Sequence, residues 1–337
     1  MTQLVIGAGL LGRSLVDYLL EKGETVRVFD MIPYTDSRIE TITGDVRNPQ
    51  NVAGACAGVD TVYHTASMVS QGLGEVPGMY DVNVTGTQNV IAACRLQGVS
   101  RLVYTSSIDV VFDGTPIING DESLPYPPRH LDYYGTTKML AEQAVIQASD
   151  PQGLQTIVLR TAGIYGPHDR HRFPPILRNA LKGVYTRLGD GRAKFNHVYV
   201  KNAAHAHWLA AQGLQQVGPP LGGQVYFITD HPPSNFFEFF LPFLEAANLP
   251  VKVRAVPLWL AQGMANAAEL AYRLFPGDDN RASPQLTRYV VAATCQDFWF
   301  SHERASRDFG YTPLVSEEKA FQYTVDWIVN EWLPANQ

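Results

Sequence analysis

Short β-branched and apolar runs alternate with segments of helical spacing through the first half of the chain. The predicted strands cover residues 4–6, 25–29, 40–43, 61–64, 102–105 and 156–159. Helices are predicted between them, and two of these, residues 11–22 and 82–97, precede Gly23 and Gly98, which can take the left-handed conformation that ends a helix. This alternation predicts an α/β fold with a Rossmann-type, doubly wound parallel sheet, whose ligand crevice lies at the carboxyl ends of the strands.

The alternation stops after about residue 166. Pro167, Pro174 and Pro175 interrupt a stretch rich in Arg and His, and mixed elements follow. One later run, residues 224–229, predicts a strand that returns to the sheet. We therefore expect a Rossmann domain over residues 1–166 and a smaller, interleaved C-terminal substrate-binding region over residues 167–337.

The segment 256–275 has a narrow polar stripe on an otherwise apolar helix. Gln262, Asn266, Glu269 and Arg273 recur at spacings of four, three and four, and most other positions are apolar. Two interpretations stay open. The helix packs in the core of the C-terminal region, or it forms a lid or a membrane-contacting surface.

Composition narrows the functional classes. The chain has 337 residues, 45% of them hydrophobic, which suffices for a full core. Its net charge of −6, without a block of Lys or Arg, argues against nucleic-acid binding. Cys56, Cys94 and Cys295 are far apart, which predicts neither a zinc site nor a disulfide framework and suits the cytoplasm. Arg13 and Asp17 interrupt the apolar N-terminus, so we expect no signal peptide and at most peripheral membrane contact.

A glycine-rich loop follows the first predicted strand. Gly7, Gly9 and Gly12 form G-x-G-x-x-G, and Leu10 and Leu11 begin the next helix. The first glycine permits a tight turn, the second lets a pyrophosphate approach the backbone, and the third lets the helix pack on the strand. The free N–H groups at the start of the helix would face the anion. The loop therefore predicts a dinucleotide site.

Asp30 closes the second strand, 18 residues after Gly12. Its carboxylate can accept hydrogen bonds from both adenosine ribose hydroxyls and would repel a 2′-phosphate. The next arginine is Arg38, which favours NAD over NADP. Arg13 is the counter-argument because it could reach a phosphate, although a solvated position on the helix is the alternative.

Tyr134 and Lys138 stand four residues apart, which places them on one helix face. A lysine ammonium stabilises a nearby phenolate and moves the tyrosine pKa toward neutral pH. An amphipathic surface helix is the alternative interpretation. The segment Thr105-Ser106-Ser107 favours the chemical one, because it ends a predicted strand where the crevice should lie.

Seven segments carry a family resemblance: residues 44–47, 58–66, 82–90, 104–107, 132–138, 163–167 and 199–207. Over nearly its whole length the chain resembles the extended short-chain dehydrogenase/reductase superfamily. It is most similar there to the 3β-hydroxysteroid dehydrogenase and sterol-4α-carboxylate 3-dehydrogenase (decarboxylating) family. The resemblance implies that Ser107 is the catalytic serine, Tyr134 the acid/base, and Lys138 a ligand of the nicotinamide ribose.

The same resemblance implies further cofactor contacts. Asp45 and Val46 would contact the adenine, Ala66 would line the cofactor, and Ile164 would lie near the nicotinamide amide. Asn83 would support the active-site helix and a proton path. Two features depart from the family pattern: the glycine loop is one residue shorter, and Thr161 replaces a usual proline.

The substrate side suggests an apolar ligand. Nucleotide-sugar epimerases and dehydratases place an arginine where this chain has Phe195, and a phenylalanine cannot neutralise a diphosphate. Arg187, Arg192 and Lys194 are close enough in sequence to supply an anionic contact instead.

Two other clusters are expected to be structural. They are the histidines His197, His205 and His207, which we do not expect to hold a metal, and the aromatic run 236–240.

Together these features predict an NAD-dependent oxidoreductase that oxidises a secondary alcohol of a hydrophobic substrate, a 3β-hydroxysteroid or a sterol, with decarboxylation if the sterol is 4α-carboxylated. The alternatives are an NADPH-dependent reductase of a 2-alkyl-3-ketoacid or dihydroflavonol type, a nucleotide-sugar epimerase, and a non-catalytic dinucleotide sensor, which should lack the Ser-Tyr-Lys set. The resemblance implies a homodimer formed through the helices at residues 82–97 and 134–149.

Overall fold

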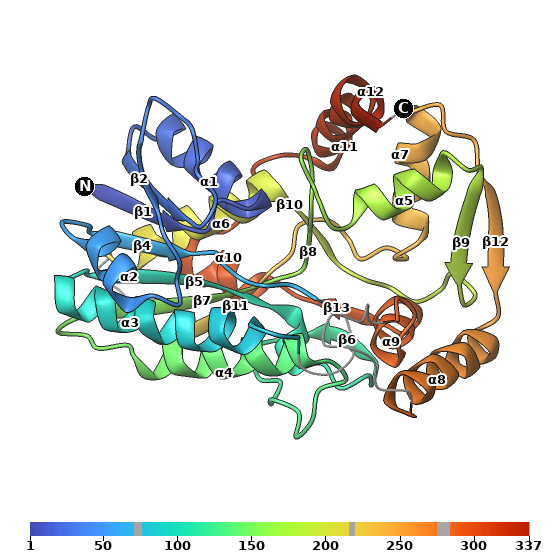
Figure 1. Cartoon of the computed structure of the whole chain (residues 1–337), viewed down its shortest axis with the longest axis horizontal. Coiled ribbons are helices and arrows are strands. Elements are labelled where there is room, and N and C mark those ends of the chain that lie inside the picture. The colour runs from blue at the N-terminus through green and yellow to red at the C-terminus, as the bar shows by residue number, and fades with distance from the viewer. Residues whose placement is uncertain (71–75, 216–219, 275–283, 337) are drawn as a thin grey trace.

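The computed structural model describes residues 1–70, 76–215, 220–274 and 284–336 (Figure 1). Its centre is a parallel sheet of seven strands. In spatial order these are β11 (Gln224–Ile228), β7 (Gln155–Thr161), β5 (Arg101–Ser107), β4 (Thr61–His64), β1 (Thr2–Ile6), β2 (Thr25–Asp30) and β3 (Glu40–Thr43). The Rossmann-type fold is confirmed, and the late strand β11 lies at one edge beside β7.

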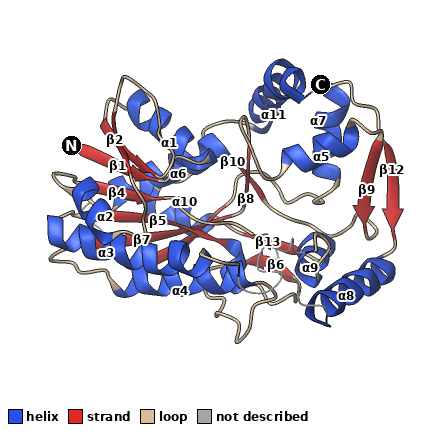
Figure 2. Cartoon of the chain, viewed as in Figure 1, coloured by secondary structure: helices blue, strands red, loops and turns tan. Residues whose placement is uncertain are grey.

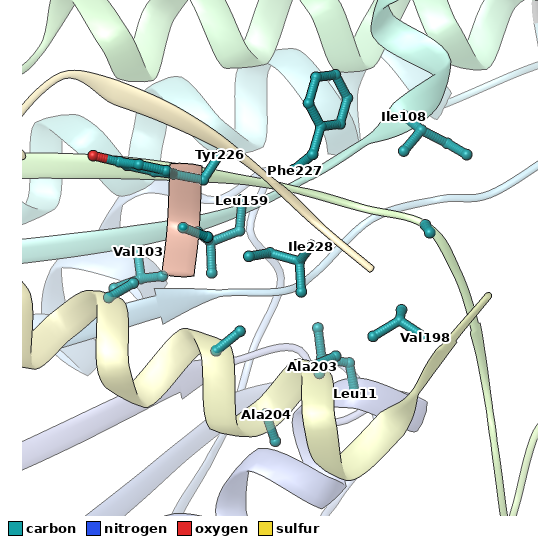
Figure 3. Packing of buried hydrophobic residues seen from close by; sticks show 14 of the residues in the cluster. Leu11, Val103, Ile108, Leu159, Val198, Ala203, Ala204, Tyr226, Phe227 and Ile228 are labelled. Carbon is teal, nitrogen blue, oxygen red and sulfur yellow. The ribbon is translucent and has the colours of Figure 1, made fainter. Parts of the chain in front are cut away.

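Helices cover both faces of the sheet, as the continuous apolar strands require (Figure 2). The helices α1 (Leu10–Glu21) and α6 (Val200–Gly213) pack on one face, and Figure 3 shows residues of this core. The helices on the other face are α2 (Pro49–Cys56), α3 (Gly86–Gln97) and α4 (Tyr133–Gln147). Alternate residues of one strand therefore enter different cores: Val103 belongs to the first, and Leu102 and Tyr104 to the second.

The C-terminal region adds three short parallel strand pairs. They are β8 (Gly163–Tyr165) with β10 (His197–Tyr199), β9 (Val184–Leu188) with β12 (Lys252–Val256), and β6 (Ile117–Gly120) with β13 (Phe298–Phe300). Its helices are α5 (Phe173–Ala180), α7 (Leu241–Ala246), α8 (Leu258–Leu274), α9 (Arg288–Cys295), α10 (Glu303–Phe309), α11 (Glu317–Trp327) and α12 (Leu333–Asn336). The pair of β6 and β13 joins the first half of the sequence to its last part.

Helix α8 packs on α9 through one narrow face, where Ala261 and Ala265 form a small hydrophobic cluster with Val291, so both interpretations of residues 256–275 stay open. Its buried residues are Ala261, Ala265 and Glu269. Large apolar side chains face solvent instead, and Trp259 is 72% and Leu274 64% exposed. Figure 1 shows α8 beside β9 and β12, at the end of the molecule away from the N-terminus. The last residue of the predicted helix, at position 275, lies outside the described residues.

No helix in the described part of the chain is long and apolar enough to span a bilayer.

Candidate active site

The three glycines of the loop meet three different surroundings. Gly7 has φ +96°, and a Cβ there would lie 2.6 Å from the Cα of Ala66. A Cβ on Gly12 would overlap the carbonyl oxygen of Gly7, so this glycine lets α1 approach β1. At Gly9, by contrast, a Cβ would meet nothing within 4 Å. The loop thus leaves open space where a pyrophosphate would approach the backbone, and the residues present fit a dinucleotide.

Asp30 ends β2 beside this loop. Its Oδ2 accepts a hydrogen bond from the N–H of Ala8 at 2.6 Å, and its Oδ1 accepts one from the N–H of Ile32 at 2.8 Å. The carboxylate is therefore fixed next to the loop, where a ribose is expected. Arg13 is exposed, but its Nε donates to the carbonyl of Ala8 at 3.0 Å, and its guanidinium lies 5.0 Å from the ring centroid of Tyr34.

The residues expected to contact the adenine have partners within the protein. Asp45 pairs with Arg47 at 2.6 Å, and this hydrogen-bonded guanidinium lowers the pKa of the carboxyl. Val46 is buried, and its carbonyl accepts a hydrogen bond from Nδ2 of Asn89 at 2.9 Å. Asp45 and Val46 lie on the segment that follows β3. Their contacts with the cofactor stay predictions.

Two other expected cofactor contacts lie at the carboxyl ends of strands. Ala66 follows β4 and donates its N–H to Ile6 at 2.8 Å, and Ile164 lies in β8 opposite Val198. Both contacts also stay predictions.

Tyr134 and Lys138 lie buried on α4, whose first turn is capped by Asp132. The Oδ1 of Asp132 accepts from the N–H of Gly135 at 3.0 Å. Lys138 Nζ donates to the carbonyl of Thr105 at 2.7 Å and lies 4.3 Å from the ring centroid of Tyr104. Burial lowers the pKa of Lys138 to about 7, although the nearby Glu142 carboxylate opposes this shift.

Burial raises the pKa of Tyr134, and the nearby hydroxyls of Ser107 and Ser67 oppose this shift. The charge of Asp109 reinforces the effect of burial, so the pKa of this phenol is raised overall. The structure thus brings Ser107, at the end of β5, to Tyr134 and Lys138 on α4. This is the arrangement that general acid/base chemistry on an alcohol requires.

Asp109 joins this group and was not found from the sequence. Ser107 Oγ donates to Asp109 Oδ2 at 2.6 Å, and the hydroxyl of Tyr289 donates to Asp109 Oδ1 at 2.6 Å. Tyr289 lies on α9, 180 residues away in the chain. The C-terminal region therefore reaches the serine through one carboxylate. No local pattern connects positions so distant, so the sequence offered no signal for this contact.

Asn83 links the loop after β4 to the active-site helix. It lies in a π-helical turn, Asp81–Thr85, that precedes α3. Its Oδ1 accepts from the N–H of Met68 at 2.8 Å, and its Nδ2 donates to Thr137 Oγ1 at 3.0 Å. Because Thr137 directly precedes Lys138, Asn83 holds the helix at the level of the catalytic residues. Its part in a proton path stays a prediction.

A cavity of about 290 Å³ opens between α8, α9 and the start of α4. Leu131, next to the capping Asp132, forms one side, and Ala292 and Arg288 of α9 form another. The polar stripe of α8 faces it, since Gln262 and Asn266 line it as well. Ser107, Asp109 and Tyr134 do not line this cavity, and most of its lining residues belong to the C-terminal region.

Comparison with known proteins assigns the chain to a family. The model of the 3-beta hydroxysteroid dehydrogenase/isomerase family matches residues 4–258. The chain belongs to this family. As a member of this dehydrogenase family it is an oxidoreductase, and the matched residues include the glycine loop, Ser107, Tyr134 and Lys138. The resemblance inferred from sequence segments is thereby confirmed.

Individual relatives agree with the family assignment. The chain is 37% identical over 322 residues to a mouse (Mus musculus) sterol-4-alpha-carboxylate 3-dehydrogenase, decarboxylating, with 95% of this chain and 88% of that protein covered. It is 36% identical over 321 residues to a 2-alkyl-3-oxoalkanoate reductase of Stenotrophomonas maltophilia, with 94% and 96% covered.

A solved structure supports the fold. The UDP-glucose 4-epimerase of Thermus thermophilus, in complex with NAD, superimposes with a TM-score of 0.76 at 22% identity and covers 98% of this chain and 100% of that one. At this identity the match bears on the architecture of the 3-beta hydroxysteroid dehydrogenase/isomerase family member and not on its substrate.

Proposed function

We propose that the protein is an NAD-dependent dehydrogenase that oxidises a secondary alcohol on a hydrophobic substrate, the 3β-hydroxyl group of a steroid or sterol. The observation that carries this proposal is the buried set of Ser107, Tyr134 and Lys138 next to the open loop at Gly9. The carboxylate of Asp30, fixed at 2.6 Å from the N–H of Ala8, supports NAD rather than NADP because it would repel a 2′-phosphate.

Each residue of the site has its own role in the oxidation. NAD, when bound at the glycine loop, would supply the hydride acceptor. Ser107 holds the substrate oxygen, and Tyr134 takes the hydroxyl proton as the carbonyl forms. The positive charge of Lys138 stabilises the phenolate of Tyr134, and Asp109 fixes the rotamer of Ser107 through the 2.6 Å bond between them. The burial of Tyr134 limits the access of water to these transfers.

The apolar character of the substrate is supported by the C-terminal region. Phe195 is buried against Phe236 and Phe298, with ring centroids 5.5 and 5.8 Å away, at the position where sugar-nucleotide enzymes carry an arginine. The relative named for a sterol-4-alpha-carboxylate supports a sterol. If a carboxylate stands on the carbon next to the oxidised one, the product is a β-keto acid, which loses carbon dioxide readily.

The alternative is a reductase that uses NADPH on a 2-alkyl-3-ketoacid. The relative from Stenotrophomonas maltophilia favours it, since its name describes reduction of a 2-alkyl-3-oxoalkanoate. An epimerase is disfavoured by Phe195.

Helix α8 supports peripheral contact with a membrane. Its exposed Trp259, Met264 and Leu274 form an apolar face. The exposed Lys252 and Arg254 of the adjacent strand β12 add positive charge on a chain whose net charge is −6. We propose that this face meets an anionic bilayer from which an apolar substrate is drawn.

We further propose a cytoplasmic homodimer formed through α3 and α4. The cytoplasmic location fits the three free cysteines, and the dimer rests on the resemblance to the extended dehydrogenases.

The deciding experiment is a substrate panel of 3β-hydroxysteroids, 4α-carboxysterols, 2-alkyl-3-ketoacids and UDP-glucose, each measured with both cofactors. We expect oxidation of a sterol with NAD and a lower Kd for NADH than for NADPH. Tyr134→Phe should lower kcat by about three orders of magnitude while NADH still binds. Turnover of Tyr134→Phe at the wild-type rate would contradict the mechanism.

A further inference from the structure

Two neighbouring side chains of the C-terminal region carry buried nitrogen atoms without partners. Arg172 directly precedes α5, and His197 begins β10. His197 is only 4% exposed, yet neither ring nitrogen has a hydrogen-bond partner among the described residues, and the same holds for Nη2 of Arg172. Buried polar groups are normally satisfied, because leaving one unpaired is costly. The described residues thus leave these three nitrogen atoms available to a ligand.

The two side chains share one aromatic enclosure. The guanidinium carbon of Arg172 lies 5.6, 5.4 and 5.4 Å from the ring centroids of Phe195, Phe236 and Phe240. The ring of His197 lies 5.2, 6.3 and 6.1 Å from the same three centroids. The aromatic rings around the two side chains lower the local polarity. A charge-assisted hydrogen bond formed inside the enclosure is therefore stronger.

The enclosure lies beside the catalytic residues. His197 is paired with Gly163 across β10 and β8, and Nη1 of Arg172 donates to the carbonyl of Gly163 at 2.7 Å. Gly163 comes two residues after Thr161, which lies opposite Ser107 in the pairing of β7 with β5. Figure 1 shows β8 and β10 between the large sheet and the C-terminal helices. A substrate held by Ser107 would thus extend toward this enclosure.

The guanidinium of Arg172 has no direct carboxylate partner among the described residues, although the nearby buried Asp169 favours its charged form. Both oxygens of the nearby Asp169 accept backbone N–H groups, from residues 171 to 173. The Oδ2 of Asp230 accepts from the N–H of Tyr199 and from Asn202. No ion pair joins the guanidinium of Arg172 to a carboxylate within the described ranges. Burial lowers the pKa of Arg172 to about 10, so the guanidinium stays charged at neutral pH.

His197 complements this charge in its neutral form. Burial, together with the charge of Arg172, holds the pKa of the imidazole well below its usual range. A neutral imidazole can donate one N–H without adding a second charge. An anion between the two side chains would then accept from Nη2 of Arg172 and from one ring nitrogen of His197.

We propose that Arg172 and His197 form a subsite for a carboxylate that the substrate carries on the carbon next to the oxidised carbinol. The inference rests on the proposed function and narrows its substrate to β-hydroxy acids. It predicts that the enzyme prefers a hydroxy acid to the same alcohol without the negative charge. The guanidinium provides the charge and the imidazole fixes the orientation of the carboxylate.

The test compares matched pairs of substrates with NAD. One pair is a 3β-hydroxysterol with a 4α-carboxylate and its 4α-methyl counterpart, and the other is a 2-alkyl-3-hydroxyalkanoate and its methyl ester. The measured quantity is the ratio of kcat/KM for the acid to that for the neutral partner. We expect Arg172→Met to lower this ratio by about 30-fold or more and His197→Phe by about tenfold. Arg172→Lys, which keeps the charge, should restore part of it.

The control is Arg307→Met, which removes an arginine whose side chain is 72% exposed and should leave the ratio unchanged. Circular dichroism and NADH binding establish that each variant is folded. Should Arg172→Met fail to fold, the ratio for the wild type and for His197→Phe still decides. A wild-type ratio near one, or equal losses on both partners, would overturn the subsite. A wild-type enzyme that oxidises none of these alcohols with NAD would instead overturn the proposed function.

Discussion

The buried ion pair between Glu142 and Arg160 allows a quantitative prediction of the change in unfolding free energy. Glu142 lies on α4 one turn after Lys138 and is completely buried. Its Oε1 accepts from Nη2 and Nε of Arg160 at 2.6 and 3.0 Å and from the hydroxyl of Tyr126 at 2.7 Å, and Ser106 donates to its other oxygen. Every neighbour of this carboxylate is thus a donor.

Glu142→Gln keeps the shape but replaces one acceptor oxygen with an NH₂ group. Arg160 then stays buried without a counter-charge, which costs about 3 to 5 kcal/mol of unfolding free energy. For 337 residues the entropy of unfolding is about 0.7 kcal/mol per kelvin. We therefore expect Tm to fall by about 4 to 7 °C, measured by circular dichroism or calorimetry.

The control for this prediction is an exposed ion pair. Nζ of Lys201 lies 2.8 Å from Oε1 of Glu21, and the two side chains are 35% and 53% exposed. Glu21→Gln should therefore lower the unfolding free energy by less than about 1 kcal/mol. Removing both buried charges in Glu142→Gln/Arg160→Met should recover part of the loss, because no charge is then left unpaired. If Glu142→Gln destabilises no more than Glu21→Gln, or if the double variant is worse by the sum of both changes, the reasoning is refuted.

Three further variants test separate steps. Gly9→Ala should change the unfolding free energy of the free protein by no more than about 0.5 kcal/mol but raise the Kd for NADH at least 100-fold, since its Cβ would occupy open space in the loop. The control is Gly23→Ala, at φ +77° far from the loop. It should lower the unfolding free energy by about 1 kcal/mol and leave the Kd unchanged. Lys138→Met should stabilise the protein by a few kcal/mol below pH 7, because the pKa of the buried lysine is lowered to about 7 in the folded state. The gain should shrink toward pH 10.5, where the lysine becomes neutral in the folded and the unfolded state alike. Urea unfolding at pH 6 and 9.5 measures the gain, and a gain independent of pH would contradict this prediction. Asp109→Asn removes a charge that raises the pKa of Tyr134, so the rise of the oxidation rate with pH should move to lower pH, and an unmoved limb in the pH–rate profile would argue against the contact.

The sequence predicted the sheet and the catalytic trio because both depend on local patterns. Most strands of the sheet are short apolar runs, although β3 is mainly polar and exposed, and Tyr134 and Lys138 are related by helical spacing alone. The segment Thr105-Ser106-Ser107 could be placed beside them since the carboxyl ends of parallel strands share one edge of the sheet, and the family resemblance implied Ser107 within it.

The rest depends on contacts that no local pattern encodes. The bond from Tyr289 to Asp109 joins residues 180 positions apart, and the two-stranded pairs of the C-terminal region are too short to show a period. Helix α8 was ambiguous because a polar stripe usually faces water. Here only Glu269 of the stripe is buried, where it pairs with Arg288 at 2.7 Å beside two small alanines, whereas Gln262, Asn266 and Arg273 are exposed.

The place of β11 at the sheet edge has a consequence for the nascent chain. Strand β7 is complete at Thr161, but its neighbour on that side is not synthesised until Ile228. At ordinary translation rates this interval lasts roughly 3 to 13 s. During it the apolar β7 presents an unpaired edge, which is the kind of surface that associates with other strands. Slow translation between these two strands would therefore lower the yield of native protein more than an equal pause after residue 228.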